Sequence, residues 1–134
     1  MKIDRISTGI CGEYFVAAEL IRHGYTIALT NYGIKHFDIL AINRETNKQI
    51  AVQVKTTFSG DNRWMIEKAD IYESKDAKIY YFFVHLNEMG TPRYFIIPND
   101  KLAEYFNKEK NERKIDFSIS SDYEKYEDAW EQLI

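Results

Sequence analysis

The sequence has a single cysteine, Cys11, and no uninterrupted run of eighteen apolar residues. One cysteine cannot form an intrachain disulfide, and no group of cysteines and histidines is spaced to build a structural zinc site. The missing apolar run excludes a membrane-spanning helix, and the first five residues lack the apolar core of a signal peptide. These absences predict a soluble protein of a reducing compartment, and we expect it in the cytoplasm.

A strongly basic character is also missing. The 134 residues carry a net charge of −3, which argues against strong nonspecific binding to nucleic acid, because such binding depends on neutralised phosphates. Residues 1–68 hold nine Lys and Arg against seven Asp and Glu, a net of +2, whereas residues 69–134 hold nine against fourteen, a net of −5. Acidic residues gather between Asp122 and Glu131, where a solvated helix face explains them most simply.

The chain does contain enough apolar material for one core. Hydrophobic residues make up 45% of the sequence and aromatic residues 15%, and a chain of this length falls within the size of one domain. No internal repeat or low-complexity segment divides it. We therefore expect a single domain over residues 1–134.

The spacing of apolar residues in the first half predicts one helix followed by strands. Five apolar residues recur at intervals of three and four, which predicts an amphipathic helix that ends near Gly24. These residues are Ile10, Tyr14, Ala17, Ala18 and Ile21. Strands are then predicted at Tyr25–Leu29, His36–Ile42 and Gln49–Thr57, and the polar turn 43–48 joins the last two as a hairpin.

The second half is dominated by an aromatic run. Ile-Tyr-Tyr-Phe-Phe-Val, within Lys78–Leu86, predicts a central strand covered on both faces. The other predicted elements are a short helix within Trp64–Ser74, a strand at Tyr94–Ile97, a helix from Asn99 to about Asn107, and a last helix through Tyr126, Ala129, Trp130 and Leu133. This order predicts an α/β or α+β fold with one mixed sheet flanked by helices.

Glu13 is the first candidate site residue. On a wheel of about 100° per residue it lies beside Ala17 and Leu20 at the flank of the predicted apolar face, whereas Glu19 faces water. A carboxylate near an apolar interface needs a partner such as a metal, a lysine or backbone donors. The alternative is an acid that merely favours the positive end of a helix.

Asp38 is the second candidate. It lies in an apolar stretch, and a period of two places it on the same strand face as Leu40 and Ile42. Aspartate is a poor strand former, so its presence there favours a function, although an aspartate that caps a turn is the alternative.

Gln53 and Lys55 lie on one side of the following strand. Any exposed antiparallel strand shows such alternation, so by themselves they indicate only a polar strand face. If the predicted hairpin forms, Asp38 can share a sheet face with Gln53 and Lys55, beneath the helix that carries Glu13.

These residue types suit the hydrolysis of a phosphodiester. Mg²⁺, for which Mn²⁺ can substitute, binds hard oxygens, polarises a phosphoryl oxygen and lowers the pKa of a bound water, and an ammonium offsets charge in the transition state. Asp38 would be the main ligand, joined by the Gln53 side-chain oxygen, the Val54 backbone carbonyl and Glu13, the last directly or through water. Lys55 would orient the nucleophilic water or stabilise the developing charge.

The chain resembles the PD-(D/E)XK nuclease superfamily, which has the restriction endonuclease-like fold, over roughly residues 5–98. The segments that carry the resemblance are Gly12–Leu20, His23–Tyr25, Phe37–Ala41 and Val52–Thr56. The set is similar to archaeal Holliday-junction resolvases and closer to group I intron homing endonucleases, which use Gln-Val-Lys. The resemblance implies an αβββαβ core, Mg²⁺-dependent cleavage of DNA by Glu13, Asp38, Gln53 and Lys55, and a homodimer or tetramer.

Two positions depart from the superfamily pattern. Phe37 replaces a proline, which is common there, and Gln53 replaces an acid, which the homing branch tolerates and which elsewhere can accompany lost activity. Three functions therefore stay open. The chain is a metal-dependent endodeoxyribonuclease of repair, recombination, restriction or mobile elements, a nuclease fold without catalysis that binds nucleic acid or a protein, or an unrelated α/β domain.

Overall fold

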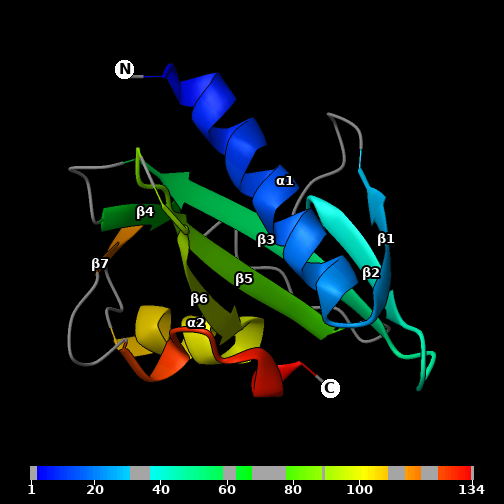
Figure 1. The fold of residues 1–134 in the computed structure, drawn as a ribbon. Helices are drawn as coiled ribbons and strands as arrows, with labels where there is room; N and C mark the ends of the chain where they lie inside the picture. The colour runs from blue at the N-terminus through cyan, green and yellow to red at the C-terminus, as the bar shows by residue number, and fades with distance from the viewer. Residues whose placement is uncertain are drawn as a thin grey trace.

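A computed structural model shows the fold (Figure 1) and describes residues 3–30, 37–58, 63–67, 78–88, 90–108, 114–118 and 124–133. The helices are α1 Arg5–Arg22, α2 Asn99–Lys108 and the short 3-10 helices η2 Glu124–Tyr126 and η3 Trp130–Gln132. The strands are β1 Tyr25–Leu29, β2 Ile39–Asn43, β3 Gln49–Thr57, β4 Arg63–Glu67, β5 Lys78–His85, β6 Arg93–Pro98 and β7 Lys114–Ser118. None of the described helices is long and apolar enough to cross a membrane.

Five strands form one mixed sheet in the order β1-β2-β3-β5-β6. β3 and β5 are parallel, and the other neighbours are antiparallel, including the predicted β2–β3 hairpin. Residues 79–84 of β5 are all buried, as expected for a central strand covered on both faces. The predicted α/β class, with one mixed sheet flanked by helices, is confirmed.

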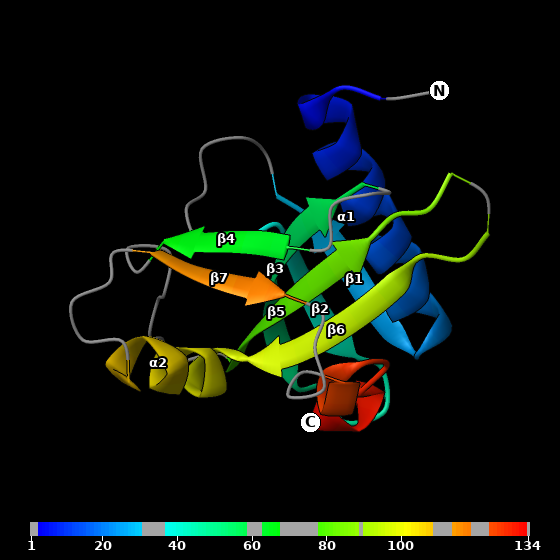
Figure 2. The ribbon, with the colours of Figure 1, turned by 90° about the vertical axis from the view of Figure 1, so that its left-hand side faces the viewer.

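Each face of this sheet has its own core. α1 lies across one face (Figure 1), where Val16, Ala17 and Leu20 pack against the strands. On the other face lie α2 and the two-stranded antiparallel sheet of β4 and β7 (Figure 2), with Trp64 and Leu102 in the second core. The five-stranded sheet therefore separates two cores, and each side chain of a strand points to one face of the sheet or the other.

The start of α1 lies earlier than the apolar spacing predicts, and its end near Gly24 is confirmed. Asp4 caps the helix, because its carboxylate accepts a hydrogen bond from the Ser7 N–H at 2.8 Å. Gly24 follows the helix with φ of +92°, in the left-handed region that glycine adopts most easily.

The buried stripe of α1 differs from the predicted one. The buried residues are Thr8, Gly12, Val16, Ala17 and Leu20, so only Ala17 belongs to the predicted stripe. Tyr14 is 62% exposed and Ile21 49% exposed. The helix meets the sheet through small residues, Thr8 and Gly12, which hydrophobic spacing does not identify as a buried face.

Two predicted helices are wrong in the described residues. Residues 63–67 form strand β4, in which buried Trp64 and Ile66 alternate with exposed neighbours, a period of two. The predicted last helix is instead η2 and η3, because Glu127 forms a β-bridge with Phe95 and the Asp128 N–H bonds to the β6 backbone. The predicted helix from Asn99 is confirmed as α2. Residues 68–74, His36 and Asp122 lie outside the described residues.

Candidate functional site

The carboxylates of Glu13 and Asp38 lie close enough together for each to shift the pKa of the other. Glu13 lies in the middle of α1, and Asp38 immediately precedes β2. One oxygen of Asp38, Oδ2, also accepts the backbone N–H of Val54 on β3 at 2.8 Å. Residues from the helix and from two strands of the hairpin therefore meet at the start of β2.

The backbone around Asp38 explains how its carboxylate reaches Glu13. Ile39 pairs with Val52 in register, yet the Asp38 N–H also donates to the Val52 carbonyl at 2.7 Å. Two successive residues thus oppose one residue of β3, which is the arrangement of a β-bulge, and a bulge redirects a side chain. On its other side, the Asp38 carbonyl accepts the N–H of Thr30 at 2.9 Å.

This bulge overturns the predicted face of Asp38. Strict alternation places Asp38 with Leu40 and Ile42, which lie on the sheet face away from α1 and are 42% and 40% exposed. Instead its carboxylate meets Glu13, on the side of the helix. Alternation fails here because the extra residue of the bulge shifts the period by one.

The prediction that Gln53 and Lys55 lie beneath α1 is wrong. Val52 and Val54 pack in the core under α1, so Gln53 and Lys55, which alternate with them, belong to the opposite face. Lys55 still lies close enough to Asp38 for their charges to attract. Among the described residues, no hydrogen bond joins half-buried Gln53 to either carboxylate.

β3 continues past the start of β2, so its residues beyond Val52 lie outside the β2–β3 pairing at the site. The β2–β3 pairing ends at Ile39 and Val52, whereas β3 continues to Thr57. In an extended strand the N–H and C=O of one residue point to the same edge, so the Val54 carbonyl points to the same edge as the N–H that binds Asp38. This carbonyl is therefore directed to the side of the strand where the two carboxylates meet.

The electrostatics favour a proton or a cation between the carboxylates. Burial, followed by the charge and the hydrogen bond of Asp38, raises the pKa of Glu13 to about 7. Burial also raises the pKa of Asp38, while the Val54 N–H, Lys55 and Glu13 act in the opposite direction. Two half-buried carboxylates cannot both ionise at low cost, so near neutral pH the pair retains a proton that a cation can replace.

The donor set fits a hard divalent cation with few protein ligands. Glu13, Asp38 and the Val54 carbonyl supply oxygens, the atoms that Mg²⁺ prefers. No group of three or more His, Cys, Asp and Glu converges within the described part of the chain. The site thus has two carboxylates rather than three, and Gln53 on β3 is neutral.

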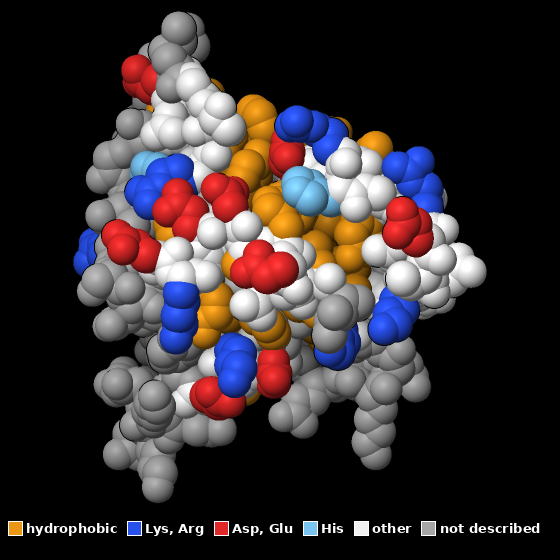
Figure 3. All heavy atoms as spheres, turned by 60° about the horizontal axis from the view of Figure 1, so that its bottom comes forward, with side chains coloured by type: hydrophobic (Ala, Val, Ile, Leu, Met, Phe, Trp, Pro, Cys, Tyr) orange, Lys and Arg blue, Asp and Glu red, His pale blue; other side chains and the backbone are white. Residues whose placement is uncertain are grey.

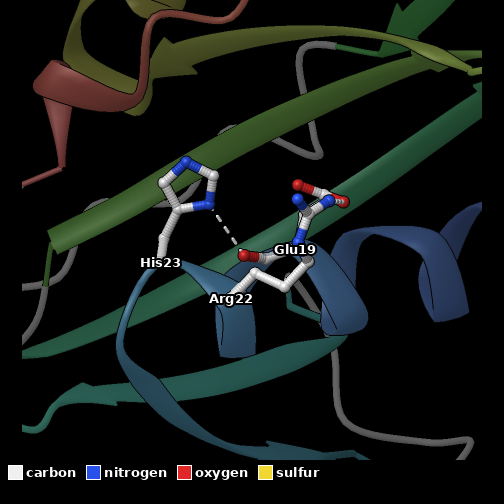
Figure 4. A network of polar contacts seen from close by, with 3 residues as sticks. All are labelled: Glu19, Arg22 and His23. Carbon is white, nitrogen blue, oxygen red and sulfur yellow. Dashed lines mark hydrogen bonds and ion pairs between the residues drawn. The ribbon is translucent and has the colours of Figure 1, made fainter.

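Glu19 is not the simple surface acid that the helical wheel predicts. Its side chain is only 21% exposed and binds Arg22 at 2.7 Å (Figure 4). Beside it, His23 caps α1, with Nδ1 2.8 Å from the Glu19 carbonyl, and stacks on Trp130 with ring centroids 3.7 Å apart. These contacts hold the C-terminal end of α1 against the C-terminal segment.

Sequence reasoning missed Thr30, whose N–H and hydroxyl both bind the backbone carbonyl of Asp38. The signal lay in the register of the β1–β2 hairpin, because extending the Leu29–Ile39 pair by one residue places Thr30 opposite Asp38. Lys2, Lys35 and His36 lie outside the described residues. On the face seen in Figure 3, acidic and basic side chains are interspersed, and the described residues form no continuous basic patch there.

Solved structures with this fold include two nucleases. The bacterial homing endonuclease I-Ssp6803I aligns with 98% of this chain and 93% of its own, at a TM-score of 0.62 and 14% sequence identity. Hjc, a Holliday junction resolvase of the archaeal hyperthermophile Archaeoglobus fulgidus, aligns over 86% of each chain, at a TM-score of 0.57 and 17% identity. No protein-family profile and no curated protein sequence matches the chain. The structural matches show that the chain has the restriction endonuclease-like nuclease fold that the sequence resemblance implies.

Proposed function

We propose that this protein is a metal-dependent endodeoxyribonuclease that hydrolyses phosphodiester bonds of DNA. The observation that carries the proposal is the Glu13–Asp38 carboxylate pair at the start of β2, where the Val54 N–H holds Asp38. The fold shared with a homing endonuclease and a Holliday junction resolvase supports DNA as the substrate. We expect Mg²⁺, or Mn²⁺ in its place, as the cofactor, and the predicted homodimer or tetramer remains part of the proposal.

Each site residue has a proposed role. Asp38 is the main metal ligand, Glu13 binds the metal directly or through a water, and the Val54 carbonyl adds a neutral oxygen. A bound divalent cation polarises the phosphoryl oxygen and lowers the pKa of a water. Lys55, which approaches Asp38 from the opposite face of the sheet, orients the attacking water and offsets the charge of the transition state.

Gln53 has the weakest support from the geometry. It follows Val52 on β3 and is half-buried, and it would need its side-chain oxygen to turn around the end of β2 to join Asp38. Its place in the proposed ligand set rests on the resemblance, because Gln53 occupies the position of the superfamily acid. A Gln53→Ala variant with reduced Mn²⁺ affinity would support this role, and an unchanged affinity would remove Gln53 from the set.

The proposal predicts cleavage that depends on both the metal and the carboxylates. Purified protein should nick supercoiled, branched or single-stranded DNA with Mg²⁺ or Mn²⁺, and Asp38→Ala and Lys55→Ala should each lose this activity. Glu45→Ala is the matched control, because Glu45 is an exposed acid in the turn between β2 and β3. Absence of cleavage of all three substrates by folded wild-type protein would refute a nuclease function.

A second candidate is a nuclease fold without catalysis that binds nucleic acid or a protein partner. The neutral Gln53 and the net charge of −3 favour it. Calorimetric titration with Mn²⁺, with and without DNA, separates the two candidates. Metal binding that disappears in Asp38→Ala supports the nuclease, whereas no metal binding even with DNA present supports the binding module.

A further inference from the structure

We propose that Gly12 and Thr56 are positioning residues, and that their contact sets the depth of α1 on the sheet and thereby the position of the Glu13 carboxylate against Asp38. The proposal rests on the nuclease function proposed above. It concerns two residues that are not ligands themselves, yet each is adjacent in sequence to a residue of the site.

The contact between Gly12 and Thr56 has no room for a side chain on the helix. A Cβ atom built on Gly12 would lie 1.9 Å from Thr56 Oγ1 and 2.8 Å from both Cβ and Cγ2 of Thr56. Rotation of Thr56 about χ1 cannot relieve the contact with its Cβ. An alanine at position 12 therefore has to push α1 away from β3, because an ordinary contact needs about 3.4 Å.

The position of this contact links it to the site. Gly12 immediately precedes Glu13 on α1, and Thr56 immediately follows Lys55 on β3. A helix moves as a rigid rod over one turn, so a displacement at Gly12 is passed to Glu13 almost undiminished. Val54, whose N–H fixes Asp38, lies only two residues before Thr56 on the same strand.

Thr56 does not gain a hydrogen bond from this arrangement. Its Oγ1 is buried and has no hydrogen-bond partner among the described residues. A buried hydroxyl without a partner costs free energy, so shape rather than hydrogen bonding is what Thr56 contributes here. The close seating of the helix is consistent with a spacer that holds the two carboxylates at a fixed separation.

The expected effect of Gly12→Ala on activity follows from how much closer its Cβ would lie to Thr56 than an ordinary contact allows. The helix and the strand must separate by about 0.6 Å to relieve the 2.8 Å contact with Thr56 Cβ, and by up to about 1.5 Å if Oγ1 keeps its rotamer. A misplacement of about 1 Å in a catalytic constellation costs about a hundredfold in rate. We therefore expect Gly12→Ala to slow nicking about a hundredfold and to weaken Mn²⁺ binding, measured without DNA, at least about tenfold.

Gly9→Ala is the matched control, since Gly9 is on the same helix and a Cβ there meets nothing within 4 Å. The test compares wild type, Gly9→Ala, Gly12→Ala, Thr56→Ala and the Gly12→Ala/Thr56→Ala double variant by Mn²⁺ calorimetry, nicking and thermal melting. Gly9→Ala should bind Mn²⁺ within about threefold of wild type, whereas Thr56→Ala, which removes one side of the contact, should weaken Mn²⁺ binding by less than Gly12→Ala does. The double variant should recover at least about tenfold of the lost nicking. The reason is that Thr56→Ala removes Oγ1 and Cγ2, which otherwise collide with the new methyl group at position 12.

The inference is overturned if folded Gly12→Ala binds Mn²⁺ and nicks DNA as Gly9→Ala does, or if the double variant recovers nothing. Should Gly12→Ala fail to fold, the double variant decides: it must fold and bind Mn²⁺ within about threefold of Thr56→Ala, and failure to do so refutes the spacer. A wild-type protein that neither binds Mn²⁺ nor nicks DNA refutes the proposed function instead. In that case the melting temperatures of wild type, Gly12→Ala, Thr56→Ala and the double variant still test the contact. If the effects of the two single substitutions add up to that of the double variant, the two residues are not coupled.

Discussion

Stability should fall as the pH rises from about 4.5 to about 8 in the absence of divalent metal. The pKa of Glu13 is 4.5 in an unfolded chain and is raised to about 7 in the folded protein. The folded state therefore binds its proton more tightly than the unfolded state in this window, so raising the pH removes stability. The contribution is fully present below pH 4.5 and is lost as the pH passes 7. Asp38, whose pKa is also raised, acts in the same direction.

The expected loss is about 1–2 kcal/mol. At about 1.4 kcal/mol per pH unit, the full shift corresponds to roughly 3 kcal/mol, and we reduce it because water screens the half-buried Glu13. For a chain of this size the loss corresponds to a fall in melting temperature of roughly 3–8 °C. Glu13→Gln should remove most of the pH dependence and be more stable than wild type at pH 8.

The assay is urea unfolding between pH 4.5 and 8.5 in the presence of EDTA, with Glu45→Gln as the matched control for loss of an exposed acid. Mn²⁺ at about a hundred times its dissociation constant should restore about 2.7 kcal/mol to wild type at pH 8, and little to Glu13→Gln. Equal pH dependence in wild type and Glu13→Gln would refute the carboxylate pair as the origin of the effect.

Three further predictions concern single side chains. Phe82→Ala should destabilise the fold by about 3–5 kcal/mol in urea unfolding, because Phe82 is fully buried in the central strand; a loss below about 1 kcal/mol would contradict that placement. Lys55→Ala should abolish nicking and move the onset of Mn²⁺ binding to higher pH, since the Lys55 charge lowers the pKa of Asp38; an unchanged onset would separate Lys55 from the site. Arg93→Ala should cost less than about 1 kcal/mol, because its 2.8 Å bond to Glu127 is partly exposed, and thermal melting against Arg93→Lys measures it.

The parts of the fold that sequence predicts well are those with strong local patterns. The aromatic run of β5 identifies the central strand, because so many large apolar residues in succession require cover on both faces. The proline that ends β6 and the helical period that follows it identify α2, and the polar residues 43–48 identify the hairpin turn. Each of these signals is contained in one segment and depends little on what packs against it.

The predictions that are wrong concern features that depend on contacts between distant segments. The buried face of α1 is set by the close approach of Gly12 to Thr56, and glycine contributes nothing to an apolar pattern. The C-terminal segment pairs with β6 through Glu127 and Asp128 instead of continuing as a helix. Such pairing is invisible to periodicity, which reports only the preference of the segment itself.

In the candidate site, too, the residues can be predicted from local sequence, whereas their arrangement depends on contacts between distant segments. Asp38 can be selected from sequence because an acid conflicts with its apolar surroundings, and Glu13 because it flanks a buried helix face. Their meeting point could not be predicted, since a bulge between Asp38 and Ile39 opposite Val52 reverses the expected alternation. The same alternation, intact in β3, places Lys55 on the far face of the sheet from α1.

The most direct test of the proposed metal site is anomalous diffraction from crystals soaked in Mn²⁺. The account predicts one strong peak between the carboxylates of Glu13 and Asp38, about 2.1 Å from a carboxylate oxygen of Asp38, and no peak in crystals of Asp38→Ala. Wild-type crystals at saturating Mn²⁺ with no peak there, or with a peak that persists in Asp38→Ala, would contradict it.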